Sequence, residues 1–237
     1  MLPLLDFIRQ TDADIMLLQE VHSSGDGSLE PRLRTMQYFA DELDYAFSSF
    51  APQFRDFDNT TDGSSFSGCA IFSRLPIVDT KLHYFYLPYS ETYRNSFETA
   101  AQHPSMLQQC QIDTESGNMN IFNLHGPWDL NGEHYGKGRQ KMSDAIISST
   151  TNLSHVILGG DTNAKPVNEA FTRITHLNSV FGNELKTTFN MKRKSLPGYA
   201  TAAVDMLWLS HDIHVTAKDC PAVEVSDHLP LIISVRL

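Results

Sequence analysis

The sequence has few cysteines, no long apolar run and no basic leader. Its three cysteines, Cys69, Cys110 and Cys220, are odd in number and far apart, so their spacing suits neither a disulfide framework nor a zinc site. We expect them to be buried thiols in a reducing compartment. No apolar run approaches the roughly 18 residues of a membrane span, and the start of the chain lacks the basic-then-apolar pattern of a secretion signal. These absences predict a cytoplasmic protein without a membrane span.

Positive charge is also scarce, with 18 Lys and Arg against 28 Asp and Glu and a formal net charge of -10. This balance disfavours broad, non-specific binding to nucleic-acid phosphates unless basic residues cluster locally or bound cations change the sign of the local charge. The one basic cluster is Lys192, Arg193 and Lys194. Three charges are more typical of a solvated loop than of a binding patch.

The length of 237 residues suits one large layered domain better than two domains joined by a linker. Hydrophobic residues make up 41% of the chain, enough to build a sizeable core. We therefore expect a single domain over residues 1–237, in a protein that is a monomer.

Apolar periodicity predicts the order of the secondary-structure elements. Helical spacing indicates helices at 2–10, 31–43, 139–149 and 167–174, and short apolar runs indicate strands at 15–18, 68–72, 107–112, 119–124, 156–158, 204–209 and 231–235. Gly117 and Asn118 suit a hairpin turn. Because strands outnumber helices and mostly follow one another, two packed sheets flanked by helices are favoured over a simple doubly wound sheet.

Residues 83–97 form the most aromatic stretch of the chain. Two interpretations remain open. The segment could be a loop that packs its rings over a sheet edge, or a substrate-facing loop that stacks on a base or covers an acyl chain.

Polar residues that could carry chemistry sit at the ends of several predicted strands, where loops on a rigid sheet commonly hold functional sites. Glu20 follows the first apolar strand, and Asp161 and Asn163 follow the apolar segment VILGG. In an extended segment, residues i and i+2 point the same way, which would place this carboxylate and carboxamide together. Taken singly, Glu20 could equally be a solvated acid, and the Asp-Asn pair could simply make a turn.

Four further residues have the same ambiguity. Asp205 lies inside the apolar segment AAVDMLWLS, where an unpaired carboxylate would be costly, so it needs a histidine or metal partner. His125 ends a strand before a Gly-Pro turn, and Asp227 and His228 precede the final strand. The alternative for His125 is a capped loop histidine, and the alternative for Asp227 and His228 is a surface ion pair.

Together these segments resemble the endonuclease/exonuclease/phosphatase superfamily, and the resemblance runs in order through nearly the whole chain. The matching pieces are LLQE, SGCAIFSRLPI, IFNLH, ILGGDTN, VDMLWLS and VSDHLPLI, while HPSMLQQ and NLHGPW resemble a bacterial branch. The resemblance implies a DNase I-like α/β fold, a four-layer α/β/β/α sandwich of two mixed β-sheets flanked by helices. It also implies a metal-dependent hydrolase acting on phosphate ester bonds.

The resemblance further implies a role for each residue. Glu20 would bind Mg²⁺ (or Mn²⁺), and Asp227 would assist the metal or the water, since hard cations take oxygen ligands. Asp161 would orient or deprotonate the attacking water, and Asn163 would hydrogen-bond the phosphate or the water.

The resemblance also gives roles to two histidines. His228, oriented by Asp205, would bind a phosphate oxygen, and His125 would stabilise the transition state or protonate the leaving oxygen. No covalent enzyme intermediate is required.

One departure from the family pattern stands out. The family normally begins with a strand that carries an asparagine near the metal, whereas this sequence begins at the helix that should follow it. Such a loss would remove a site residue and expose a strand edge. Two functions therefore stay open. One is hydrolysis of a phosphodiester or phosphomonoester in a nucleic acid, lipid or small molecule. The other is a catalytically weak relative that acts as a binding module.

Overall fold

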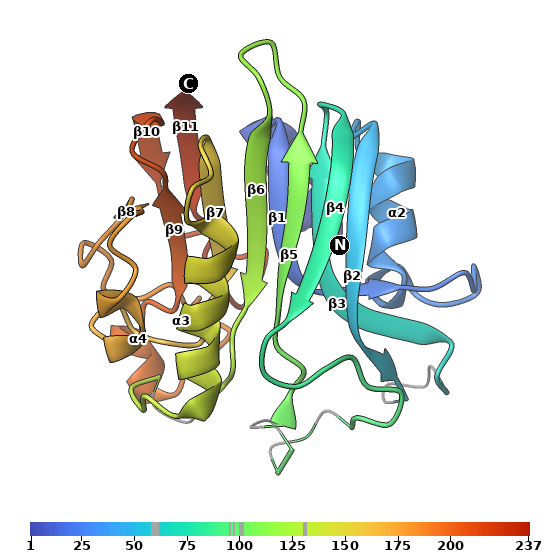
Figure 1. Cartoon of the computed structure of the whole chain (residues 1–237). Helices are drawn as coiled ribbons and strands as arrows, with labels where there is room; N and C mark the ends of the chain where they lie inside the picture. Colours follow the sequence, from blue (N-terminus) through green and yellow to red (C-terminus); the bar gives the residue numbers. More distant parts are fainter. Residues whose placement is uncertain (58–61, 95, 97, 100–101, 130–131) are drawn as a thin grey trace.

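The computed structural model describes residues 1–57, 62–94, 96, 98–99, 102–129 and 132–237, and within them it confirms the layered sandwich (Figure 1). One layer is a six-stranded sheet in which β6 and β7 are parallel and the other neighbours antiparallel. Its strands, in spatial order, are β4 (Ile77–Tyr84), β5 (Met106–Ile112), β6 (Met119–His125), β7 (Val156–Asp161), β9 (Asp205–Leu209) and β8 (Asn178–Ser179).

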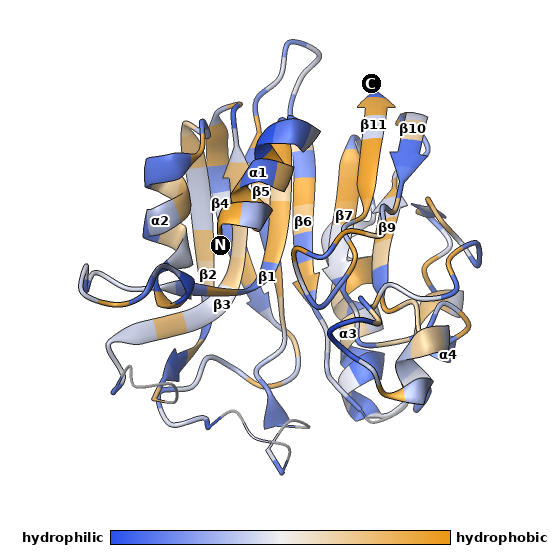
Figure 2. Cartoon of the chain, turned by 180° about the vertical axis from the view of Figure 1, so that it is seen from behind, coloured by the Kyte–Doolittle hydropathy of each residue, from blue (hydrophilic) through white to orange (hydrophobic). Residues whose placement is uncertain are grey.

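The second layer is antiparallel and divided into two parts. A three-stranded sheet has the order β1-β3-β2, and β10 and β11 form a separate pair. The bounds are β1 (Ile15–Ser23), β2 (Phe47–Asp56), β3 (Ser65–Ser73), β10 (His214–Asp219) and β11 (Ile232–Arg236). In Figure 2, β6 and β7 are visible between β1 and β11. The six-stranded sheet is therefore mixed, as expected, whereas the facing layer is antiparallel and divided into two parts.

Three apolar clusters hold the layers together. Between the sheets, Ile15 and Leu17 of β1 and Ile233 and Val235 of β11 pack on the same cluster of β6, β7 and β9 side chains. Outside the three-stranded sheet lie α1 (Leu2–Thr11) and α2 (Thr35–Glu42), and outside the six-stranded sheet lie α3 (Lys137–Thr150) and α4 (Glu169–Thr172). Single-turn 3₁₀ helices occupy Pro31–Leu33 and Pro197–Thr201.

All four predicted helices and all seven predicted strands are present, with some boundaries shifted. The predicted helix 31–43 divides into a 3₁₀ turn and α2, because the backbone of Arg34 (φ -140°) leaves the helical region between them. Strands β2, β4, β8 and β10 were not predicted. Pro52 interrupts the pattern of β2, β8 has only two residues, and β4 and β10 are too exposed to need an apolar run.

The structure places the three cysteines as free thiols, with Cys69 and Cys110 buried and Cys220 half-buried. Across the described residues, no helix combines the length and apolar content needed to cross a bilayer.

Candidate active site

Strand register places three of the predicted residues at one level of the six-stranded sheet. His125 on β6 is the register partner of Asp161 on β7, which in turn pairs with Asp205 on β9. Each of the three lies where an apolar strand ends or begins, so the buried strands fix their positions. A row of imidazole and two carboxylates therefore crosses the edge of the sheet.

Two carboxylates side by side across strands repel each other unless a cation or proton sits between them. His228 supplies a partner, because its Nδ1 lies 2.8 Å from Asp205 Oδ2 and donates to it. Ligand atoms of Asp161, Asp205 and His228 all lie within 4.8 Å of one another. The hydrogen bond confirms that the carboxylate inside the apolar segment has a histidine partner.

Burial and neighbouring charge shift the protonation of this group in opposite directions. Burial, followed by the negative charge of Asp205, raises the pKa of Asp161 to about 7. Burial disfavours the charged form of His228, but the charge and hydrogen bond of Asp205 outweigh it and raise the pKa of His228 to about 9. Asp161 is thus suited to accept a proton near neutral pH, while His228 is an imidazolium.

The turn after β7 brings Asp161 and Asn163 together by a different route from the predicted one. The chain does not stay extended, since Asn163 is left-handed (φ 50°) and its backbone N–H donates to Asp161 Oδ1 at 2.7 Å. The Asp161 side chain therefore makes a turn, which was the alternative interpretation of the Asp-Asn pair. The Asn163 amide donates to Gly126 O at 3.1 Å. Both side chains still line the same pocket.

Glu20 reaches the site from the facing layer. It lies inside β1, at the irregularity where the register with β3 shifts, and has a positive φ of 55°. Such bulges re-aim a side chain at a cost in backbone strain. The flanking strand is tied to β6, because Gln19 Nε2 donates to Asn123 Oδ1 at 2.6 Å and Asn123 Nδ2 donates to Leu18 O at 2.9 Å. Asn123 and His125 lie on the same side of β6, so this tie places Glu20 beside the row of site residues.

His125 is buried, and its tautomer is fixed by Gln53. The Gln53 amide donates to Pro104 O, so its Oε1 faces His125 Nδ1 at 3.0 Å and accepts from it. Burial, with the nearby positive charges of His228 and Lys194, lowers the pKa of His125 to about 4. The neutral ring therefore has its lone pair on Nε2, and donation to a leaving oxygen would require that this nitrogen is protonated first.

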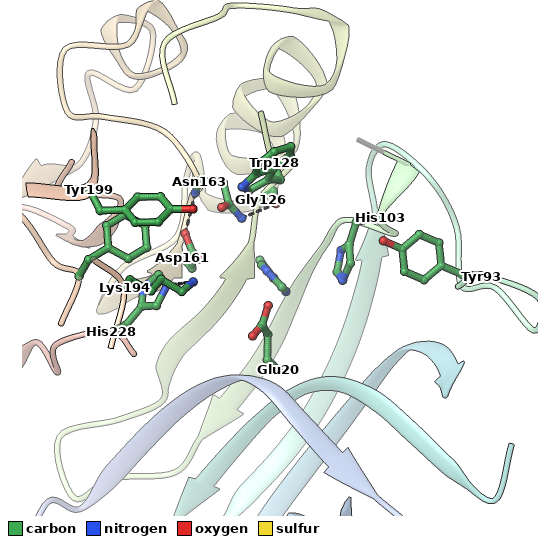
Figure 3. A pocket seen from close by; sticks show the side chains of 12 residues that line it. Glu20, Tyr93, His103, Gly126, Trp128, Asp161, Asn163, Lys194, Tyr199 and His228 are labelled. Atoms are coloured by element: carbon green, nitrogen blue, oxygen red, sulfur yellow. Dashed lines mark hydrogen bonds between the residues drawn. The ribbon is translucent and has the colours of Figure 1, made fainter. Parts of the chain in front are cut away.

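These residues converge on a pocket of about 190 Å³ at the edge of the two layers (Figure 3). Five of the seven predicted residues line it: Glu20, His125, Asp161, Asn163 and His228. Asp205 supports His228 from behind. Asp227 is paired with Lys194, with Nζ and Oδ2 3.0 Å apart, and does not join the group around Asp161.

Sequence reasoning missed several pocket residues as site members. The additional residues are Tyr93, His103, Gly126, Trp128, Phe189, Lys194 and Tyr199. Some signals were present. Tyr93 belongs to the aromatic stretch 83–97, of which residues 95 and 97 lie outside the described residues, and Lys194 belongs to the basic cluster. His103 begins HPSMLQQ, and its ring packs at a tilt of 56° against that of His125, with centroids 4.8 Å apart.

The sequence profile of the endonuclease/exonuclease/phosphatase family matches residues 1–228. The chain belongs to this family. Its members are phosphoesterase hydrolases and are generally dependent on a divalent metal. No curated protein sequence matches the chain.

Solved structures share the fold at low sequence identity. A Beutenbergia cavernae endonuclease/exonuclease/phosphatase has a TM-score of 0.71 and 16% identity, over 99% of this chain and 65% of that one. A mannosyl-6-phosphatase from Bacteroides thetaiotaomicron has a TM-score of 0.63 and 18% identity, over 99% and 90%. TDP2 from D. rerio, solved with a single-strand DNA product, has a TM-score of 0.69 and 14% identity, over 99% and 90%. The fold thus occurs among both phosphatases and nucleic-acid enzymes.

The donor set suits a hard divalent cation. Glu20 and Asp161 bring carboxylate oxygens into one pocket, and the adjacent Asp205 adds negative charge that His228 only partly balances. Mg²⁺ and Mn²⁺ prefer oxygen ligands and are commonly held by one or two carboxylates together with substrate phosphate. His228 is a poor ligand while protonated, which leaves it free to bind an anion.

Proposed function

We propose that this protein is a divalent-metal-dependent phosphoesterase that hydrolyses a phosphodiester or phosphomonoester by direct attack of an activated water. The row His125–Asp161–Asp205, completed by the hydrogen bond from His228, is the observation that carries the proposal. It combines a buried carboxylate that can accept a proton with a cationic imidazole that can bind a phosphate oxygen. Both groups would assist the hydrolysis of a phosphate ester by water, the first as a general base and the second by stabilising the developing negative charge.

In this proposal, Glu20 holds Mg²⁺ or Mn²⁺, which when bound neutralises phosphate charge and makes water more acidic. Asp227, the second predicted ligand, would have to give up its pairing with Lys194 to reach the cation. Asp161 orients the water and accepts its proton. The Asn163 amide, held at the same turn, adds a donor toward the phosphate.

The two histidines have distinct tasks. His228 donates from Nε2 to a non-bridging oxygen of the phosphate, while Asp205 orients the ring through Nδ1. His125 offers an acceptor at Nε2 to a hydroxyl of the substrate, or donates to the leaving oxygen after gaining a proton. The substrate is a phosphate ester of a nucleic acid, lipid or small molecule.

The direct test measures hydrolysis of bis-p-nitrophenyl phosphate, p-nitrophenyl phosphate and plasmid DNA with Mg²⁺, with Mn²⁺ and with EDTA. We expect turnover of at least one substrate that EDTA abolishes and that Asp161→Asn lowers strongly. Asp144→Asn is the matched control, since Asp144 pairs with Arg173 on the surface. Absence of metal-dependent hydrolysis on all three substrates would favour the binding-module alternative.

A further inference from the structure

Lys194 places a second cationic donor next to His228. Its Nζ lies 3.5 Å from His228 Nε2 and 3.0 Å from Asp227 Oδ2, and the side chain lines the pocket. Since Asp205 occupies Nδ1 of His228, the ring nitrogen that faces Lys194 is Nε2. Two nitrogen donors so close together are suited to share one anionic group with several oxygens.

Two aromatic rings also help to hold Lys194 in this position. The Lys194 ammonium lies 5.1 Å from the centre of the Phe189 ring and 5.8 Å from that of Tyr199. Phe189 in turn packs against His228, with ring centroids 4.5 Å apart. A cation ordered by aromatic faces loses little side-chain freedom when an anion binds. Figure 3 shows Lys194, His228 and Tyr199 on one side of the pocket, across from Tyr93 and His103.

The other two residues of the basic cluster point elsewhere. Lys192 pairs with Glu224, and Arg193 donates to Glu224 O, both at the surface. Among the described residues that line the pocket, Lys194 is the one lysine or arginine. The cluster therefore supplies a single cation to the site, in place of a basic track for a polynucleotide backbone.

We propose that Lys194 and His228 together bind the terminal oxygens of a phosphomonoester, which makes monoesters of compact organic molecules the preferred substrates. This inference rests on the proposed phosphoesterase function. A monoester carries one more negative charge than a diester near neutral pH, so it gains more from a second cation. The pocket of about 190 Å³ is also smaller than the roughly 300–1,000 Å³ typical of ligand sites, which favours one organic substituent over two.

The test compares p-nitrophenyl phosphate with bis-p-nitrophenyl phosphate, which share a leaving group, at saturating Mn²⁺. Lys194→Met should lower kcat/KM for the monoester by about 10- to 100-fold, the range of a lost charge-assisted hydrogen bond, and lower that for the diester less than about threefold. Lys192→Met is the control and should change neither. Lys194→Arg, which keeps the charge, should retain most of the monoester activity and guards against a merely misfolded Met variant.

A binding measurement separates this inference from the proposed function. Inorganic phosphate should bind the Mn²⁺-loaded protein by calorimetry, at least about tenfold more weakly in Lys194→Met than in Lys192→Met. Phosphate binding that depends on Lys194, without hydrolysis of either ester, would sink the proposed function and leave the phosphate site standing. Equal loss on both esters, or unchanged phosphate affinity in Lys194→Met, would overturn the inference while leaving hydrolysis intact.

Discussion

Strands β6 and β1 have similarly apolar sequences but very different surroundings. β6 has neighbours on both sides, β5 and β7, and all seven of its residues are buried. Within the described chain, β1 pairs with β3 alone, and Val21 is the one buried residue among its nine. The sequence of a strand thus predicts that it forms, while its neighbours decide how far it is buried.

The difference divides the site between a well-packed half and a looser half. His125, Asp161 and Asp205 are fixed by register in the six-stranded sheet. Glu20 comes from an edge strand, at a bulge with a left-handed residue. The half proposed for acid–base chemistry should therefore be rigid as folded, and the half proposed to bind metal should depend more on metal occupancy and on its neighbours.

The largest expected effect contrasts Asp161 with Glu20. Asp161→Asn should lower turnover at least about 100-fold at any metal concentration, because a positioned general base contributes 10²–10⁴, and the fold should stay intact. Glu20→Gln should lose activity mainly through metal affinity, so raising Mn²⁺ should recover much of it. Steady-state rates over a Mn²⁺ titration check this. Asp161→Asn with near wild-type turnover would remove the base role.

A second contrast measures packing in the two layers directly. Leu124 in β6 is fully buried, whereas Leu18 in β1 is half-buried. We expect Leu124→Ala to lower the free energy of unfolding by about 2–5 kcal/mol, and Leu18→Ala by only about 1–2 kcal/mol, since less apolar area is lost. Urea denaturation of the two variants gives both values. Equal losses would show that β1 is as well packed as β6.

A third prediction concerns the edges of β1 and β11 that pair with no further strand among the described residues. β1 and β11 pack on the same face of β6 and β7. In Figure 2, β6 and β7 are visible between β1 and β11. A designed strand of about ten residues, supplied as an N-terminal extension, should pair with the edge of β1, the strand that carries Glu20.

The comparison uses the 237-residue chain and a form extended upstream. Melting temperature should rise by several degrees, since 1–2 kcal/mol shifts it by about 2–8 °C at this size, and Mn²⁺-dependent turnover should rise with it. A control extension of the same length rich in glycine and serine should change neither. Equal stability and activity in the extended and original forms would show that the unpaired edge of β1 limits neither property.

The fold was largely predictable because the buried strands carry apolar runs. Those runs located β6, β7 and β9, which carry His125, Asp161 and Asp205. Among the strands that escaped prediction, β10 is exposed along its whole length and needs no apolar pattern. The division of the second layer into two parts was not predicted.

The site was predictable where residues follow strands and not where they arrive from loops. Asp161 and His228 stand next to apolar runs, so a strand-end argument finds them. Lys194 and Trp128 reach the pocket through loop geometry that single-residue patterns do not encode. Gln53, which sets the tautomer of His125, comes from β2, one of the strands that was missed.

The smallest expected effect tests the link between the six-stranded sheet and the loop before β11. The pKa of His228 is raised to about 9 in the folded state, above its ordinary value of 6.5, so the pair with Asp205 contributes stability that is fully present below about pH 6.5. That contribution is lost as the pH rises through about 9. Asp205→Asn removes the charge that holds the proton, so the pKa of His228 should fall below that of the wild type.

NMR titration of His228 gives the pKa in both proteins, and thermal melts between pH 6 and 10 give the linked stability. The wild type should lose stability across the upper part of this window more steeply than Asp205→Asn does, because only the wild type releases the His228 proton there. Asp212→Asn, which removes a carboxylate beside His155, is the control and should leave the His228 titration unchanged. If His228 titrates at the same pH with and without Asp205, the loop is not electrostatically coupled to the sheet, and the orienting role of Asp205 fails with it.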